Sequence, residues 1–156
     1  MRLQIALDRC LVLFCMLLYM HNPVLKRLEI GAFWEELDSF PDFQVPSQLE
    51  ELELCGWPKL KSLPQQIQHL TSLTSLAISL FDGVETLPEW FCNLTSLTLL
   101  EIRHCANLLY LPTVEAMQRL TKLLALVIHS CPQLKERCAK DSGPEWPKIS
   151  RILCRR

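Results

Sequence analysis

Apolar residues recur along the chain at a fixed spacing. Three segments, beginning at Leu49, Leu73 and Leu97, align without a gap and start at equal intervals (73 − 49 and 97 − 73). A fourth begins at Leu123, after a slightly longer step. Each segment holds two apolar residues separated by one, which predicts a short strand whose alternate side chains point to the same face. The predicted inward pairs are Leu52 and Leu54, Leu76 and Ile78, Leu100 and Ile102, and Leu126 and Ile128.

Each predicted strand is followed by a turn and then by a short helical segment. The turn position holds Trp57, Phe81, Cys105 and Cys131. After the Leu-Pro pairs that end at Pro64, Pro88 and Pro112, apolar residues stand three apart, which suits one helical or 3-10 turn. Proline can open such a turn because its φ already fits. These later apolar pairs are Ile67 and Leu70, Phe91 and Leu94, and Met117 and Leu120.

One such unit cannot bury its own apolar face, so several units must stack. The interval between the units, about 24 residues, lies in the range of leucine-rich repeats. The sequence therefore predicts an α/β fold: a right-handed, curved leucine-rich-repeat solenoid. We expect a parallel sheet on its concave face and short helices, 3-10 turns and loops on its convex face. The repeats are assigned to residues 25–134.

The same frame extends toward the N-terminus. It places Leu28 and Ile30 in an inward pair with Phe33 at the turn, and Ile5 and Leu7 in another with Cys10 at the turn. Residues 1–24 are thus interpreted as a degenerate repeat. The alternative is a signal-like apolar segment, because the run from Cys10 to Met20 resembles a signal peptide core. Such a run is too short to span a bilayer.

The frame ends after Leu134. Residues 135–156 are predicted to be a cap and tail without a further strand, in which Trp146 and Ile149 cover the last repeat. No comparable cap is visible at the other end of the chain, so we expect further sequence upstream.

Composition narrows the possible partners. The 156 residues are 49% hydrophobic and 21% charged, which is typical of one globular domain. A net charge of −1 provides no broad field for nucleic acid or membrane lipid. The cysteines are scattered through apolar runs without compact pairing, which favours reduced, buried thiols. They are Cys10, Cys15, Cys55, Cys92, Cys105, Cys131, Cys138 and Cys154.

Several motifs resemble those of one family. They are LP-x-x-(I/F)-x-x-L-T-S-L, C-x-x-L-x-x-LP and the closing CPQLKERCAKDSGPEWPKISRI. Between about Leu25 and Ile152 the chain resembles the C-terminal repeats of plant nucleotide-binding leucine-rich-repeat disease-resistance proteins. The resemblance implies a cytoplasmic immune receptor acting in plant defence. Its repeats would sense pathogen effectors or guarded host proteins and restrain a nucleotide-binding module.

The chain departs from that family in one respect. It contains no G-x-x-x-x-G-K-[ST] motif and only four glycines, so it holds no phosphate-binding loop. It therefore resembles a truncated sensing portion without the nucleotide-binding module. Two alternatives remain: a free-standing intracellular repeat scaffold that binds a signalling partner, and an extracellular recognition domain. The extracellular alternative would make the Asn93-Leu94-Thr95 sequon a glycosylation site.

The candidate binding surface lies between the inward positions of the strands. A central row is predicted from Ala6, Glu29, Glu53, Ala77, Glu101 and Val127, and a flanking row from Arg9, Ala32, Gly56, Leu80, His104 and Ser130. We interpret these positions as an ordinary solvated face. The alternative is an acidic-to-basic recognition patch, with Glu29, Glu53 and Glu101 on its acidic side and Arg103, His104 and His129 toward the strand ends. Leu80, Leu99 and Val127 are predicted to be exposed apolar contacts. The candidate protein-binding residues are Glu29, Glu53, Leu80, Leu99, Glu101, Arg103, His104, Val127 and His129.

No catalytic or cofactor site is predicted. His104 and Cys105 are adjacent, and adjacent strand residues point to opposite faces, so they cannot share a proton. His129, Cys131 and Cys138 could suggest zinc, but Cys131 fills the turn position that Phe81 fills elsewhere without a metal. The sequence thus predicts a non-enzymatic chain, without cofactor or metal, that recognises a protein partner.

Overall fold

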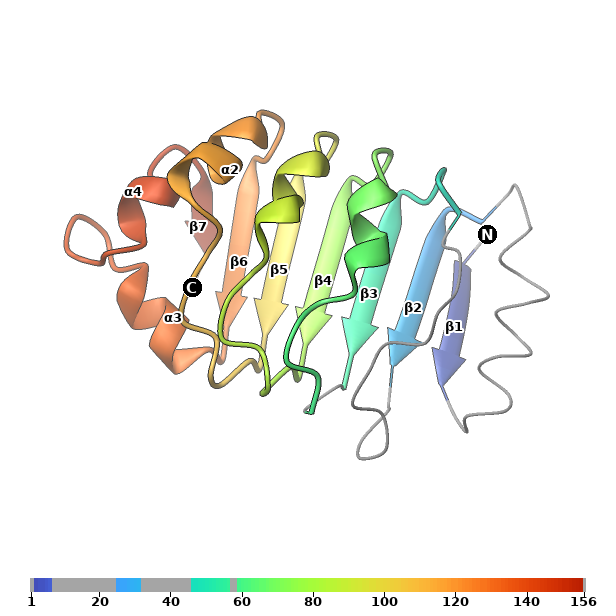
Figure 1. Cartoon of the computed structure of the whole chain (residues 1–156), viewed down its shortest axis with the longest axis horizontal. Helices are drawn as coiled ribbons and strands as arrows, with labels where there is room; N and C mark the ends of the chain where they lie inside the picture. Colours follow the sequence, from blue (N-terminus) through green and yellow to red (C-terminus); the bar gives the residue numbers. More distant parts are fainter. Residues whose placement is uncertain (1, 7–24, 32–45, 57–58, 156) are drawn as a thin grey trace.

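The computed structural model describes residues 2–6, 25–31, 46–56 and 59–155, which form an α/β fold with one parallel sheet. Its seven strands lie in chain order, so each strand pairs with the one before it (Figure 1). They are β1 Arg2–Ala6, β2 Arg27–Gly31, β3 Glu51–Cys55, β4 Ser75–Ser79, β5 Leu99–Arg103, β6 Ala125–His129 and β7 Leu153–Arg155.

The predicted inward pairs form the core. In β3 to β6 the second and fourth residues are buried, and the residues between them are partly exposed. The register places Leu52, Leu76 and Leu100 on successive strands. Each is no more than 3% exposed. Since burying a leucine contributes about 1.5–3 kcal/mol, the column of aligned side chains is the main source of stability.

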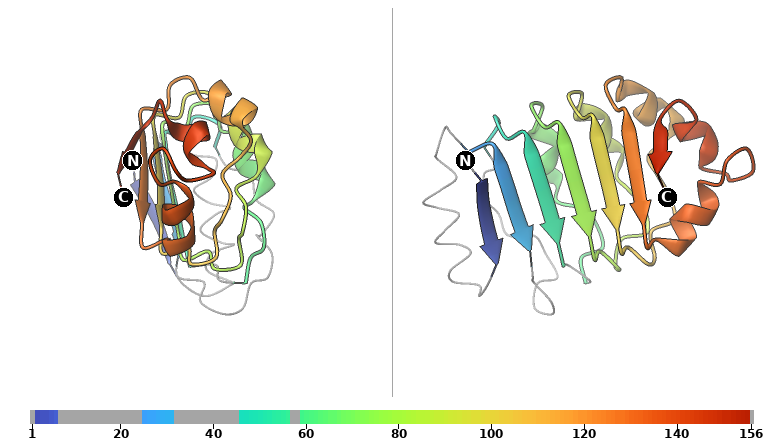
Figure 2. Two further views of the ribbon diagram at one scale, coloured as in Figure 1. Left: turned by 90° about the vertical axis from the view of Figure 1, so that its left-hand side faces the viewer. Right: turned by 180° about the vertical axis from the view of Figure 1, so that it is seen from behind.

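The predicted helical segments form a second layer. The 3-10 helices η1 (Gln65–His69) and η2 (Glu89–Asn93) and the helix α2 (Val114–Arg119) lie on one side of the sheet (Figure 2). Pro64 and Pro88 precede η1 and η2 directly, which agrees with their predicted role in opening the turns. The three segments bury Ile67, Phe91 and Met117 against the core.

Each of the strands β3 to β6 is followed by a residue with left-handed backbone. Gly56, Leu80, His104 and Ser130 have φ values of 79°, 60°, 51° and 53°. The first three donate their backbone N–H to the last residue of the next strand, at 2.9–3.1 Å. The prediction that this flanking row lies on the strands is therefore wrong. These residues follow the strands and extend the hydrogen-bond ladder while the chain turns away.

The predicted frame fails at the N-terminus. The register pairs Leu3 with Leu28 and Ile5 with Ile30, so the residues aligned with Leu28 and Ile30 lie two positions earlier than predicted. Gln4, not Ala6, pairs with Glu29 in the central row. The pattern had aligned Ile5 with Leu28, whereas the structure aligns Leu3 with Leu28. The first unit lacks the shared motif, so the leucine pattern does not give its length.

Several predictions fall on residues outside the described ranges. They concern Leu7, Arg9, Cys10, Ala32, Phe33, Trp57 and the apolar run up to Met20. Within the described ranges no helix combines the length and apolar character needed to cross a membrane.

The C-terminal segment closes the end of the core. Helices α3 (Pro132–Arg137) and α4 (Trp146–Ile149) pack there, with Ile149 fully buried and Trp146 partly buried against the core, as predicted. The prediction of no further strand is wrong, because β7 pairs in parallel with β6. At three residues β7 is too short to show an alternating pattern.

A buried carboxylate fastens this segment to the sheet layer. Glu145 is 3% exposed, and its Oε2 accepts the Leu111 N–H at 2.8 Å and the Lys148 ammonium at 2.7 Å. The Arg137 guanidinium lies 3.6 Å from Oε1. Arg151 donates to the carbonyl of Met117 at 2.6 Å. The polar contacts of the cap therefore reach back to the unit that contains α2.

Candidate protein-binding face

One face of the sheet remains uncovered by the described helices (Figure 2). We call it the open face. Its side chains come from the first, third and fifth positions of the strands, opposite the buried pairs. Its residues are Arg27, Glu29, Glu51, Glu53, Cys55, Ser75, Ala77, Ser79, Leu99, Glu101, Arg103, Ala125, Val127 and His129.

The predicted central row is confirmed from β2 to β6. Glu29, Glu53, Ala77, Glu101 and Val127 are consecutive partners in the register. Parallel strands lie about 4.8 Å apart, so these side chains form a line across the sheet. The row is acidic on β2, β3 and β5 and apolar on β6.

A hollow of about 310 Å³ lies over β4. The strand contributes the small side chains of Ser75 and Ala77 to its lining. Longer side chains from β3 and β5 form the sides, among them Glu53, Glu101 and Leu99. The hollow arises because β4 carries Ser, Ala and Ser where its neighbours carry longer residues. It offers space for a side chain from another molecule.

Charges on the open face are interleaved. The Arg103 guanidinium forms an ion pair with Glu101 on the same strand and lies 3.9 Å from Glu53 on β3, reaching across β4. A second pair joins Arg27 and Glu51 at 3.1 Å. At Arg103 the charges therefore do not separate into an acidic and a basic region. The small residues of β4 allow Arg103 to lie among the glutamates.

The open face nevertheless carries a negative balance. Four glutamates and two arginines give −2 with the histidine neutral. The Arg103 and Glu53 side chains are 40% and 34% exposed. Exposed ion pairs contribute little to stability, about 0–1 kcal/mol, so a partner can replace them at low cost.

The two predicted histidines lie together at the strand ends. His104 and His129 are exposed, and their ring centroids are 5.6 Å apart in an edge-to-face arrangement. His104 follows β5 and His129 ends β6. Leu80 occupies the equivalent place after β4. The structure thus groups these predicted residues at one margin of the open face.

The predicted exposed apolar residues are only partly exposed. Leu80, Leu99 and Val127 are all of intermediate exposure. The most exposed large apolar residues of the described chain include Leu124 and Leu153, at 69% and 58%. They adjoin, since the Leu153 N–H donates to the Leu124 carbonyl at 3.0 Å.

Sequence reasoning missed Leu124 although a signal existed. The equivalent residue of the two preceding units is Thr74 and Thr98, whose hydroxyls donate to the carbonyl of the unit before. At Leu124 the repeat replaces this hydrogen-bonding side chain with an apolar one. An apolar residue at a position that is polar in the preceding units thus indicates an exposed apolar side chain.

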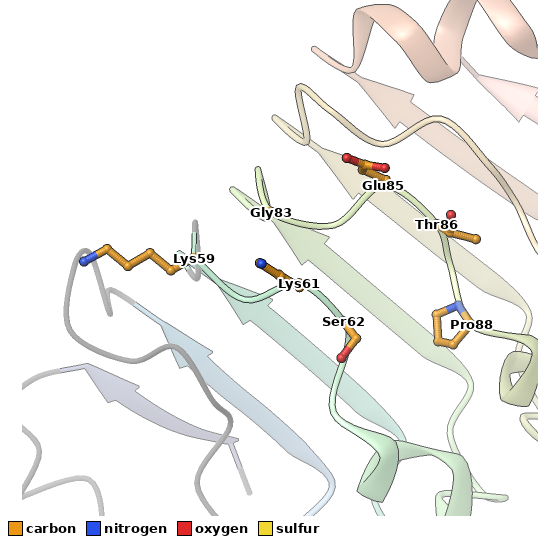
Figure 3. Close-up of a pocket in the computed structure, with 7 residues that line it drawn as sticks. All are labelled: Lys59, Lys61, Ser62, Gly83, Glu85, Thr86 and Pro88. Atoms are coloured by element: carbon orange, nitrogen blue, oxygen red, sulfur yellow. The ribbon is translucent and has the colours of Figure 1, made fainter.

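A larger hollow lies among the loops that follow β3 and β4. Its volume is about 870 Å³ and its lining includes Lys59, Lys61, Glu85 and Thr86. Figure 3 shows these side chains spread along two neighbouring loops instead of converging on one point. An arrangement without convergent polar groups gives little basis for binding a small ligand.

The structure also shows where the residues of the rejected catalytic and metal sites lie. Cys105 is buried and His104 exposed, and both follow β5 instead of lying on it. Among the described residues no group of three or more histidine, cysteine or acidic side chains could hold a metal ion. Asn93, the first residue of the predicted glycosylation sequon, is partly buried, and its amide donates to Gln68 at 3.4 Å.

Comparison with known proteins does not identify a family for the chain. No protein-family model matches the sequence, and no curated protein matches it significantly.

Proposed function

We propose that the chain is a leucine-rich-repeat recognition module whose open face binds a protein partner. The observation that carries the proposal is the aligned row Glu29, Glu53, Ala77, Glu101 and Val127, on a face that no described helix covers. Such a row presents side chains at fixed intervals without contributing to the core. Selection on these positions can therefore serve binding alone.

The chemistry of the face favours a partner with basic and apolar residues. The balance of −2 attracts a cationic surface, and a lysine or arginine of the partner can replace Arg103 beside Glu53 and Glu101 at the hollow. Farther along the sheet, the exposed Leu124 and Leu153 offer apolar contact. Ion pairs alone give specificity more than affinity, so the apolar end is needed to hold the partner.

The role in plant defence is proposed from the motifs. The repeat register and the closing CPQLKERC and GPEWPKI elements resemble the C-terminal repeats of cytoplasmic immune receptors. In this proposal the partner is a pathogen effector, a guarded host protein or the nucleotide-binding module of a related receptor. The chain catalyses no reaction and needs no cofactor.

Affinity purification with quantitative mass spectrometry tests the proposal. Wild-type chain, a face variant Glu53→Lys/Glu101→Lys and a control variant Glu115→Lys are each used as bait in plant cell extract. Glu115 is exposed on α2, on the helical side of the sheet. We expect specific partners to be kept by the control and reduced at least about tenfold by the face variant, since paired interface charges strongly affect binding. Equal recovery with all three baits would contradict the proposal.

A further inference from the structure

Cys105 and Cys131 are neighbours in space although they stand 26 positions apart in the sequence. They occupy the same position in consecutive units, just after the left-handed residues that follow β5 and β6. The Cys105 N–H donates to the Cys131 sulfur at 3.3 Å. Their shared turn position in consecutive repeats predicts this juxtaposition.

The backbone geometry suits a disulfide between the two units. Equivalent residues of neighbouring parallel strands are about 4.8 Å apart, within the range of about 4.4–6.8 Å between Cα atoms in disulfides. The ladder still holds one residue before the pair, where the His104 N–H donates to the His129 carbonyl at 2.9 Å. The distance of 3.3 Å between the Cys105 nitrogen and the Cys131 sulfur places the two residues within reach of such a bond.

The two thiols differ in acidity. The hydrogen bond from Cys105 lowers the pKa of the Cys131 thiol to about 7, against the opposing effect of burial. The same hydrogen bond, together with burial, raises the pKa of Cys105. The Cys131 thiol is thus the more acidic of the two and the one expected to attack an oxidant as its thiolate.

We propose that Cys105 and Cys131 form an oxidisable dithiol that closes to a disulfide between neighbouring units when it meets a peroxide. Cys131 thiolate attacks one oxygen of hydrogen peroxide, the O–O bond breaks, and the hydroxide released takes up a proton to give water. The resulting sulfenic acid is attacked by the Cys105 sulfur. The S–S bond forms, the S–O bond breaks, and hydroxide leaves with the Cys105 proton as a second water.

The pair lies directly beneath the surface. Both cysteines are 1% exposed, but their flanking residues His104, Ala106 and Ser130 are exposed. In the reduced form each sulfur lies 3.3 Å from a backbone carbonyl at a strand end, that of Arg103 or that of His129. The disulfide removes these thiol donors from the strand ends that lie beside the histidines. Oxidation is therefore expected to affect the margin that carries the histidines.

Peptide mapping of the oxidised full-length chain tests the proposal. The reduced protein is treated with hydrogen peroxide, blocked with N-ethylmaleimide and digested with trypsin without reduction. Because trypsin cuts after Arg103, Arg119, Lys122 and Lys135, the proposed bond joins peptides 104–119 and 123–135. We expect this product to exceed any linked product of Cys55 or Cys92 at least about tenfold, and its formation rate to rise through pH 7.

Cys55 and Cys92 provide the matched comparison, because they are more accessible yet not paired with each other in the structure. The variant Cys55→Ser/Cys92→Ser should form the bond at the wild-type rate. In Cys105→Ser, circular dichroism checks folding, and dimedone should trap a sulfenic acid on Cys131. Recovery of Cys105 and Cys131 as alkylated thiols while Cys55 or Cys92 oxidises would overturn the proposal, as would a bond from either to another cysteine.

Discussion

The interior units and the closing C-terminal segment stabilise the same core in different ways. From β3 to β6 each unit repeats the same apolar positions, and its side chains pack on those of its neighbours. The closing segment repeats nothing. It is fastened by a buried carboxylate, Glu145, and by hydrogen bonds to the backbone groups of Leu111 and Met117. Removing an apolar side chain and removing a polar contact should therefore have different consequences.

The largest effect is expected from Leu100→Asp. Leu100 is fully buried between Leu76 and Leu126, so the substitution places an unpaired charge within the apolar column. The loss should exceed about 4 kcal/mol, which is comparable to the whole stability of many domains. Circular dichroism and thermal unfolding measure it. The control is Leu99→Asp on the open face, where we expect less than about 1 kcal/mol. A folded Leu100→Asp with an unchanged midpoint would refute the register.

Gly143→Ala tests how tightly the closing segment packs. A Cβ at this position would collide with the Arg137 carbonyl oxygen and lie 2.6 Å from the Ala139 nitrogen. The backbone must shift, at a cost of about 1–3 kcal/mol. Ser142→Ala, at the exposed neighbouring residue, should change the midpoint of chemical unfolding very little. Equal midpoints for both variants would show that the segment packs loosely.

Glu145→Ala should cost about 2–3 kcal/mol, because it leaves the Leu111 N–H and the Lys148 ammonium without their shared acceptor. Glu145→Gln keeps an oxygen for Leu111 and should cost about half as much. Urea unfolding gives both values, with exposed Glu136→Ala as the control. If Glu145→Ala and Glu136→Ala unfold alike, the carboxylate does not hold the cap.

The smallest effect on stability is expected from Arg103→Ala. The arginine side chain is 40% exposed, and exposed ion pairs are worth about 0–1 kcal/mol. Its contacts with Glu53 and Glu101 should therefore matter for binding but not for folding. A thermal midpoint within about 2 °C of wild type is expected. A large decrease would mean that the open face is part of the folding core.

The sequence predicts the interior of the molecule because each position is copied from unit to unit. Leu76 and Leu100 could be assigned to one column since both occupy the same place in the repeat. The side of the sheet on which Glu53 and Glu101 lie follows from alternation. Because the same pattern occurs in several units, the assignment of buried and exposed positions rests on more than one strand.

The remaining features depend on contacts that do not recur from unit to unit. The β1 register was misplaced by two positions because its unit lacks the motif, and β7 was missed because it has three residues. From the sequence alone Glu145 would be assigned to the surface, because its contacts with Leu111 and Lys148 are evident only in the structure. On the open face, the reach of Arg103 across β4 depends on the small residues beneath it.

Methyl NOE measurements on leucine-labelled protein test the central claim, that side chains from successive units form one continuous column. Leu52, Leu76 and Leu100 lie on consecutive strands about 4.8 Å apart. We expect strong cross-peaks between Leu52 and Leu76 and between Leu76 and Leu100. A Leu52–Leu100 cross-peak should be about 60-fold weaker, because the separation doubles and intensity falls with its sixth power. Absence of the two neighbour cross-peaks would contradict the fold and the binding face built on it.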